Sequence, residues 1–470
     1  MGTIWEPAHI EGQGPKYKGV VETIRTGIAS GALSIGEKLP PVRDLAWRLR
    51  ITPGTVARAY TILTDEGVLT AEVGRGTFVA DTSARTAPYV PIEIDSIDHE
   101  SGGDTDNVSL FSPHLPSMGQ AGLIRRKLAE IAQSPPSGVM HYPNRASGLP
   151  ARHAVASWLA GTPVGRLTEA DIVLSHGGQS AILLILQAIL QGRRPTVLVE
   201  QLAYPGFRRA AELLRADVVS VPMDEEGLIP EALEATARRL PEVQVICTSP
   251  EVHNPTCGFT PESRRHEIAE IARRHDLQIV EDDCYRMGRA QAACYRQIAP
   301  ERGWYVGSIS KTITPALRIG YAVAPEGQVA RVRRAAEHSF FGLATPLTDL
   351  TTAVLTDPSL PVITEKVRMV INSYVQTAVN VLGAYDLRWR EDVPFLWLHL
   401  PPGWRATAFC QAAEARGVQI RAAEEFAGRD AQTPHAVRFA INAGVSLRSF
   451  EAAMNRLRDL LDNPPEHIGV

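Results

Sequence analysis

The most informative stretch of this chain reads Ser308-Ile309-Ser310-Lys311-Thr312-Ile313-Thr314-Pro315-Ala316-Leu317-Arg318-Ile319-Gly320. Its lysine, Lys311, follows a strand-like run at residues 304–306 and has small hydroxylated neighbours, and Arg318 comes seven residues later. A lysine that carries an aldehyde cofactor as a Schiff base needs a rigid strand end, hydroxyl groups for an anion and a nearby cation. The motif Ser-x-Ser-Lys alone is weak evidence, because most lysines are solvated surface charges.

From about residue 109, strand-like runs alternate with helix-like runs. The strand-like runs are residues 171–175, 196–200, 216–221, 243–248, 277–282, 304–306 and 319–323. This alternation predicts an α/β fold whose mainly parallel sheet is covered by helices on both faces. Ligands of such folds bind at the carboxyl ends of the strands, and the chemically unusual residues of this chain fall there.

Three of these strand ends carry candidate binding residues. Gly178, in His-Gly-Gly-Gln-Ser before a helix expected from about Ala181, would let backbone N–H groups meet a phosphate, although a plain tight turn fits equally well. Asn254 could donate to a phenolic oxygen, or it could only form a turn with the proline that follows. Asp282 ends an apolar strand and needs a cationic partner, which a protonated pyridine nitrogen would provide; a helix cap or a metal ligand is the alternative.

The order of these elements is a phosphate turn, Asn-Pro, a strand-end Asp with Tyr three residues on, and Ser-x-Ser-Lys with Arg seven residues on. Over roughly residues 109–465 the chain resembles the fold-type I aminotransferases. The resemblance implies a seven-stranded sheet with a small α+β domain, and pyridoxal 5'-phosphate bound as a Schiff base to Lys311, with Asp282 at its pyridine nitrogen. The other cofactor contacts that it implies are Tyr285 and Asn254 at the 3-oxygen, Gly178, Gln179, Ser308, Ser310 and Arg318 around the phosphate, Tyr204 against the ring, and Tyr142 from a partner subunit.

The same resemblance assigns the substrate carboxylate to Arg438. This arginine lies in a β-like run at residues 435–440 and matches the arginine that binds a carboxylate through two parallel hydrogen bonds. An arginine on such a run would otherwise be expected at the surface.

Residues 15–80 have the pattern of a small DNA-binding module. Tyr17, Val21, Ile24 and Ile28 recur at helical spacing, and a second short helix is expected to end near Leu49. A third helix is expected to begin with Thr52 as its N-cap and Pro53 in its first position, and to carry Val56, Tyr60 and Leu63 inward. Two β-prone runs, 68–72 and 77–80, complete a three-helix module with a hairpin wing.

This module resembles the winged helix-turn-helix domain of the GntR family, in the run LPPVRDLA…TPGTVARAY…GVLTAEVGRGTFV. The second helix of such a motif lies in the major groove of DNA, and an arginine in a wing can enter the minor groove. The DNA contacts that the resemblance implies are Arg43, Thr52, Thr55, Arg58, Arg75 and Gly76.

Charge is distributed unevenly along the chain. Residues 15–80 carry nine Lys or Arg against six Asp or Glu, whereas residues 81–108 carry seven acids against Arg85 alone. This pattern predicts a nucleic-acid-binding unit at residues 12–80, an acidic linker at 81–108 and a large domain at 109–470.

The composition indicates a cytoplasmic protein that neither enters a membrane nor binds a metal. Its longest apolar run, residues 181–190, is far shorter than a membrane span needs, and the first residues have no basic start or apolar core. The five cysteines are an odd number and lack Cys-x-x-Cys spacing, which argues against a disulfide framework and against a zinc site.

A winged helix joined by a linker to an aminotransferase-like domain resembles the MocR/GabR-type branch of the GntR family. The resemblance implies a homodimeric transcription regulator that binds promoter DNA and senses an amino acid-like effector, which replaces Lys311 in an external aldimine. The alternative is a working aminotransferase with an accessory DNA-binding arm. Tyr285 stands at the spacing of ordinary aminotransferases, because Cys284 is inserted where those regulators often read Glu-Asp-Asp-Tyr, and this keeps catalysis open.

Overall fold

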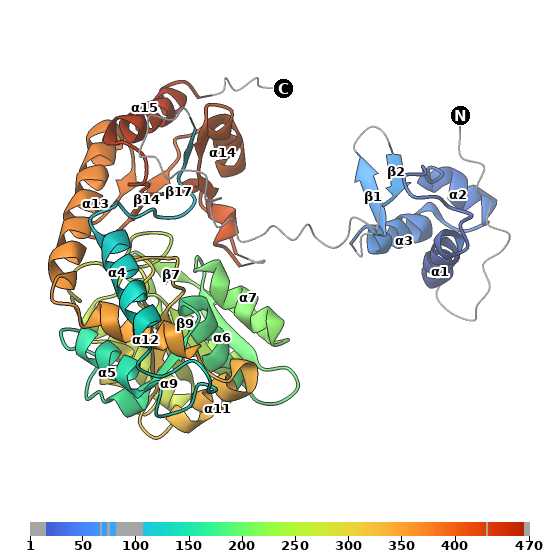
Figure 1. Ribbon diagram of the computed structural model, residues 1–470. Coiled ribbons are helices and arrows are strands. Elements are labelled where there is room, and N and C mark those ends of the chain that lie inside the picture. The colour runs from blue at the N-terminus through green and yellow to red at the C-terminus, as the bar shows by residue number, and fades with distance from the viewer. Residues whose placement is uncertain (1–15, 66–67, 73–75, 81–106, 429–430, 465–470) are drawn as a thin grey trace. The chain divides into compact units, whose positions relative to one another are not determined.

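The structure is a computed structural model that describes residues 16–65, 68–72, 76–80, 107–428 and 431–464. The chain divides into two compact units, residues 1–94 and residues 95–470. Each unit is described by itself below, and Figure 1 labels their helices and strands.

The first unit consists of three helices and a two-stranded hairpin. Its elements are α1 (Lys16–Ala29), α2 (Val42–Arg48), α3 (Pro53–Asp65), β1 (Leu69–Glu72) and β2 (Gly76–Val79). Val56, Tyr60 and Leu63 of α3 are buried in its core, as the sequence predicts. Residues 36–39 extend the hairpin, because Leu39 N donates to Thr77 O (2.8 Å) and Val79 N donates to Glu37 O (2.8 Å). The expected three helices and hairpin are confirmed.

The second unit is built around a seven-stranded sheet in the order β4-β12-β11-β10-β9-β5-β6. The strands are β4 (Ile172–Ser175), β5 (Thr196–Glu200), β6 (Asp217–Val221), β9 (Val243–Thr248), β10 (Gln278–Asp282), β11 (Gly303–Ser308) and β12 (Gly320–Val323). All neighbours pair in parallel except β12, which runs antiparallel to both β11 and β4. The predicted mainly parallel sheet is therefore confirmed.

Helices cover both faces of this sheet (Figure 1). One apolar cluster joins the sheet to α6 (Gly178–Ile189), α7 (Pro205–Leu213) and α11 (Val329–Phe340). A second cluster lies on the other face, with α8 (Pro230–Arg239), α9 (Glu262–Arg274) and α10 (Tyr295–Ile298). A third cluster joins β4 and β12 to α4 (Gln120–Gln133), α5 (Leu149–Trp158) and α12 (Thr345–Leu355). These last three helices pack on the large sheet.

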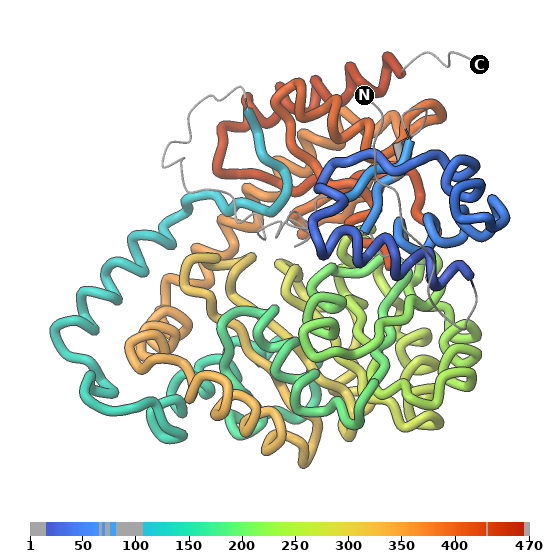
Figure 2. Tube along the Cα trace, turned by 90° about the vertical axis from the view of Figure 1, so that its right-hand side faces the viewer, coloured from blue at the N-terminus to red at the C-terminus, as the bar shows by residue number. Residues whose placement is uncertain are grey.

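The C-terminal part forms a second, smaller layer. Its four-stranded sheet has the order β13 (Leu387–Arg388), β14 (Phe395–His399), β17 (Ala436–Ala440), β16 (Arg421–Ala422). Helices α13 (Leu360–Leu382), α14 (Ala406–Glu414) and α15 (Leu447–Asp462) surround it. The start of the unit, β3 (Val108–Ser109), pairs in parallel with β15 (Val418–Gln419), and Figure 2 shows this early segment among the C-terminal elements.

The remaining elements are short: η2 (Glu169–Asp171), β7 (Met223–Asp224), β8 (Gly227–Leu228) and η3 (Ala423–Glu425). Within the described ranges, no helix has both the length and the apolar character that crossing a bilayer requires.

Candidate functional site

Lys311 lies in the turn that follows β11, half-buried. Its Nζ is 5.5 Å from the centre of the Tyr285 ring, and among the residues that the structure describes none accepts a hydrogen bond from it. The turn is held by two hydroxylated residues, since Ser308 Oγ donates to Ile319 O (2.9 Å) and Ser310 N donates to Ser308 Oγ (3.1 Å). A lysine amine without a partner, held on a braced turn, is available for covalent chemistry.

Asp282 ends β10 and is 6% exposed. Its Oδ1 accepts a hydrogen bond from Cys284 N (3.0 Å), but no cationic side chain of the described residues lies within ion-pair distance. Burial raises the pKa of this carboxyl to about 6, because the charged form is poorly solvated there. A buried carboxylate in this state calls for a cation from a ligand.

The turn from β4 to α6 contains the two glycines, and both are closely packed. Gly177 has a φ of 83°, and a Cβ there would lie 2.5 Å from Arg318 Nη2. A Cβ on Gly178 would collide with Cys284 Sγ. Helix α6 begins at Gly178, so the expected start near Ala181 is wrong. Close packing with Cys284 outweighs the poor helix propensity of glycine at position 178. The early start of the helix places its first N–H groups next to Arg318.

Arg318 faces this turn from an unusual backbone conformation. Its φ is 50°, in the left-handed region that non-glycine residues seldom adopt. Its guanidinium lies over Gly177, and it lowers the pKa of His176 in addition to the effect of burial. The cation therefore sits at the N-terminus of α6, where an anion would find both a positive charge and free N–H groups.

Gln179 and Tyr204 meet above the start of α7. Gln179 Nε2 donates to Gly206 O (2.9 Å), while its Oε1 is buried and, among the described atoms, has no hydrogen-bond partner. A Cβ on Gly206 would collide with both Gln179 and Tyr204. Burial, and to a lesser extent Tyr285 and Asp282 nearby, raises the pKa of the Tyr204 hydroxyl.

Arg438 lies on β17 of the small sheet and contacts Asn254, one of the predicted cofactor-binding residues. It is 3% exposed on β17, its Nη1 donates to Asn254 Oδ1 (3.1 Å) and its Nη2 donates to Phe111 O. Its guanidinium lies between the rings of Phe395 (5.5 Å) and Phe426 (5.2 Å). Burial lowers its pKa, and the Tyr285 hydroxyl next to it acts in the opposite direction. Its Nε is buried without a partner in the described structure.

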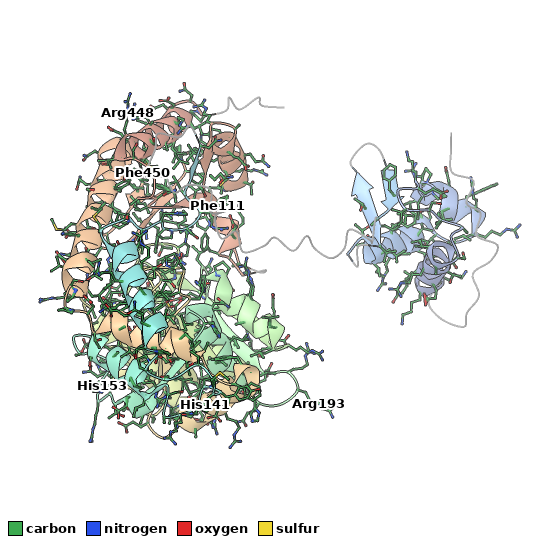
Figure 3. All side chains as sticks on the ribbon, in the orientation of Figure 1. Phe111, His141, His153, Arg193, Arg448 and Phe450 are labelled. Carbon is green, nitrogen blue, oxygen red and sulfur yellow. The ribbon has the colours of Figure 1, made fainter. Side chains whose placement is uncertain are left out.

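One predicted contact lies apart from the others within this chain. Tyr142 is 83% exposed, and its ring lies 6.2 Å from that of Phe341. In Figure 3 its neighbour His141 is at the end of the unit opposite Phe111. Val139, Met140 and Phe341 are also more than two-thirds exposed, so Tyr142 belongs to an uncovered apolar patch.

In the first unit, the predicted DNA contacts that the structure describes are exposed, apart from the partly buried Thr55. Arg43 and Thr52 are exposed, and Thr52 Oγ1 bonds to Thr55 Oγ1 (2.9 Å) rather than to a main-chain N–H, while Thr52 O accepts from Thr55 N (3.0 Å). Arg58 is exposed with its guanidinium 4.3 Å from the centre of the Tyr17 ring. The predicted contacts also include Gly76, which has a φ of 118°, and Arg75, which lies outside the described residues.

The residues of the large unit fit pyridoxal 5'-phosphate. Asp282 lacks the cation that the protonated ring nitrogen provides, Lys311 offers a free amine for the aldehyde, and the glycine turn with Arg318 can receive the phosphate.

Residues 116–457 match the family described as aminotransferase class I and II, and residues 16–79 match the bacterial regulatory proteins of the gntR family. The chain belongs to the class I and II aminotransferase family. In this member a GntR-type helix-turn-helix domain precedes the aminotransferase domain, and pyridoxal 5'-phosphate is the cofactor of the latter.

Three comparisons illustrate the similarity. YdeF of Bacillus subtilis, an uncharacterized HTH-type transcriptional regulator, is 26% identical over 462 residues, which is 98% of this chain and 97% of that protein. PdxR of Corynebacterium glutamicum, an HTH-type pyridoxine biosynthesis transcriptional regulator, is 28% identical over 316 residues, 67% of this chain and 66% of that one. The structure of an archaeal alanine:glyoxylate aminotransferase superposes with a TM-score of 0.68 at 22% identity, covering 76% of this chain and 91% of that one.

Sequence reasoning missed residues beside the cofactor site of the second unit and a residue beside the hairpin of the first unit. Phe111 and Arg421 contact Arg438 or its partners but are far from it in sequence, so no local motif marks them. Lys38 lies against the hairpin, since a Cβ on Gly76 would be 2.6 Å from its Cε. A basic residue just before Leu39-Pro40 in a basic module is a signal that could have suggested it.

Proposed function

We propose that this protein is a transcription regulator that binds promoter DNA through residues 12–80 and senses an amino compound through the cofactor held at Lys311. The observation that carries the proposal is that one chain combines three helices and a hairpin around a common core with a site whose buried Asp282 and free Lys311 suit pyridoxal 5'-phosphate. The names of YdeF and PdxR, which describe transcriptional regulators, support it. A free enzyme would not need the helix-turn-helix.

The residues divide the work of holding the cofactor and the effector. Pyridoxal 5'-phosphate supplies an aldehyde that bonds reversibly to primary amines. In this proposal Asp282 keeps the ring nitrogen protonated, Tyr285 and Asn254 hydrogen-bond the 3-oxygen, and Tyr204 packs on the ring. The phosphate is held by Gly178, Gln179, Ser308, Ser310 and Arg318.

Arg438 is proposed to orient the effector by its carboxylate. It is buried at 3% exposure and has a Nε without a partner among the described residues, which favours a ligand group over a solvent-exposed role. Once the effector amine replaces the lysine, the Lys311 amine is free to hold or move a proton next to it. A slow transamination half-reaction is therefore compatible with the regulator.

A homodimer is part of the proposal. Val139, Met140, Tyr142 and Phe341 form an exposed apolar patch, and large exposed apolar residues in one place are typical of interfaces. A partner subunit that covers this patch would receive Tyr142 at its phosphate site. Two DNA-binding modules per dimer suit two half-sites on the promoter. We expect the dimer to act in the cytoplasm, where promoter DNA and amino metabolites are both accessible.

Two measurements test the proposal. Holo-protein treated with borohydride should retain the cofactor covalently on the peptide that contains Lys311, and Lys311→Ala should lose this attachment. Fluorescence anisotropy with DNA from upstream of the gene should show binding that an amine from a panel of amino acids modulates. The working aminotransferase becomes the better interpretation if the holo-protein turns over amino acids rapidly and deletion of residues 1–80 leaves its DNA affinity unchanged.

A further inference from the structure

Two arginines converge on one main-chain carbonyl beside the proposed effector site. Arg438 donates through Nη2 to Phe111 O, and Arg421 donates through Nε to the same oxygen (3.3 Å). Arg421 lies directly opposite Arg438 in the ladder of β16 and β17, so the two side chains project from the same face of the small sheet. The Phe111 ring also packs on the Arg421 guanidinium, 4.7 Å from its carbon. Figure 3 places Phe111 with the C-terminal part of the unit.

Like charges directly opposite each other in a ladder destabilise it unless an anion lies between them. Glu425 pairs with Arg421 Nη1 (2.5 Å), but Glu425 is 42% exposed, and nothing comparable pairs with Arg438 in the described structure. Arg421 contributes, after burial, to the lowered pKa of Arg438. A carbonyl dipole is a weak neutraliser of two guanidinium groups, and a full carboxylate charge is a better one.

Arg438 already donates through both of its terminal nitrogens while this contact persists. Its Nη1 donates to Asn254 and its Nη2 to Phe111, and its Nε is buried and without a partner among the described residues. A carboxylate that accepts the Nη2 hydrogen now bonded to Phe111 must therefore replace the carbonyl there.

The backbone around Phe111 is anchored on both sides but free in the middle. Leu110 N donates to Gln419 O (2.8 Å), Ala440 N donates to Leu110 O (2.8 Å), and His114 N donates to Ile441 O (3.0 Å). Between these anchors, the N–H groups of Phe111 and Ser112 have no hydrogen-bond partner in the described part of the chain, and Pro113 has no N–H. The bend at residues 111–113 can thus shift without breaking the ladder.

Resting on the proposed function, we propose that Phe111 O holds the place of a ligand carboxylate oxygen, and that Arg421 is the second guanidinium of this carboxylate subsite. A bound carboxylate takes the position between Arg438 and Arg421 and displaces the bend at residues 111–113. The effector class is then amines that carry a carboxylate, and recognition is coupled to movement of the chain segment that follows the linker.

The test compares an amino acid with the amine that lacks only its carboxylate. Holo-protein is titrated with L-alanine and with ethylamine, and the cofactor absorbance gives an apparent Kd for each. We expect Arg421→Gln to raise the Kd of L-alanine about tenfold and that of ethylamine less than twofold, because only the carboxylate loses a charged hydrogen bond. Arg421→Lys should raise the Kd of L-alanine by less than Arg421→Gln does. The control is Arg448→Gln, an exposed arginine at the same end of the unit, which should change neither value.

Hydrogen exchange gives a second readout that does not depend on activity. Saturating L-alanine, but not ethylamine, should change the amide exchange of residues 111 and 112 several-fold, because displacement of the bend alters the solvent access of their unbonded N–H groups. Equal effects of Arg421→Gln on both ligands, or a spectral change with L-alanine without changed exchange, would overturn the inference while the proposed function stands. Absence of any spectral change with both ligands would overturn the lysine chemistry of the proposed function and this inference with it.

Discussion

At the scale of single residues, the buried carboxyl group of Asp282 lowers the folding stability of the cofactor-free protein. Asp282 has a folded-state pKa of about 6, well above the ordinary aspartate value of 3.8, because it is buried with no cation among the described residues. The folded protein therefore binds this proton more tightly than the unfolded chain does. As pH rises from about 4 to above 6, Asp282 must ionise in a poorly solvated place, and cofactor-free stability falls accordingly.

Asp282→Asn should make the cofactor-free protein more stable at pH 8 and leave it nearly unchanged at pH 4. Each pKa unit corresponds to about 1.4 kcal/mol, so the gain in unfolding free energy should reach roughly 3 kcal/mol. Glu281, whose pKa burial raises to about 7, titrates in both proteins, so its effect cancels in the comparison. Urea unfolding at the two pH values measures this, and a gain that is equal at both would contradict the account.

The same substitution should weaken cofactor binding. The contact between a carboxylate and a protonated ring nitrogen contributes about 1.5–3 kcal/mol, and asparagine cannot replace its charge. Equilibrium dialysis of pyridoxal 5'-phosphate at pH 8 gives the affinity. Asp276→Asn, on an exposed carboxylate away from the site, is the matched control. An Asp282→Asn variant that binds the cofactor as tightly as the wild type would place the ring nitrogen elsewhere.

Gly178 and Cys284 should behave as a coupled pair. Gly178→Ala brings a Cβ into Cys284 Sγ, and overpacking of this kind costs about 1–3 kcal/mol. In the double variant with Cys284→Ala the nearest atoms become Val306 Cγ1, 3.7 Å away, and the Cβ of residue 284, 3.8 Å away, which are ordinary contacts. Thermal unfolding of the four proteins should show that the second substitution restores most of the lost stability. Additive losses would mean that the collision is not the cause.

At the scale of elements, α3 is the candidate reading helix, and its Arg58 lies against Tyr17 of α1. Arg58→Ala should reduce DNA affinity by about 1–3 kcal/mol with relaxed sequence preference if Arg58 contacts a base, and uniformly if it contacts phosphate. Affinity should fall steeply with salt in both proteins. Anisotropy with specific and scrambled duplexes distinguishes the two cases, and Arg448→Gln serves as the control for loss of one positive charge.

The strands whose bounds could be predicted most accurately are those marked by a short run of residues in the sequence. Strands β5 and β9 have the predicted bounds, because a strand buried on both faces reads as a continuous apolar run. Strand β11 extends beyond the predicted run to Gly303 and Ser308, since glycine and serine give no strand signal of their own. The antiparallel direction of β12 follows from the connection at residues 309–319, which holds no crossover helix, and not from the composition of the strand.

The site itself was partly accessible in the same way. Lys311, Asp282 and the glycine turn each stand at a strand end, where the topology of an α/β sheet brings ligand-binding residues together. Phe111 and Arg421 were not accessible, because they meet across 310 residues and neither belongs to a short motif. Cys284 is visible in the sequence, but its contact with Gly178 comes only from packing.

At the scale of the whole molecule, sensing and DNA binding should be separable by mutation. Arg438→Ala should leave covalent cofactor attachment at Lys311 and basal DNA affinity intact, because Arg438 reaches the cofactor site only through its hydrogen bond to Asn254 and is not among the predicted DNA contacts. It should abolish the response of DNA binding to the effector. A ligand shifts an equilibrium only by its difference in affinity between two states, so loss of the carboxylate contact removes that difference. Anisotropy titrations with and without the effector measure this, and a normal response would require a different carboxylate site.

The strand order of the large sheet also determines how much of the chain must be synthesised before the sheet can form. Strand β4 is the first of the seven to be made, yet β12, the strand it pairs with in the described sheet, is the last. The glycine turn after β4 is therefore completed only when the chain has emerged past residue 323, whereas the core of the first unit draws on residues 20–79 alone. Since domains generally fold in order of synthesis, the nascent chain should possess a DNA-binding module well before it possesses a cofactor site.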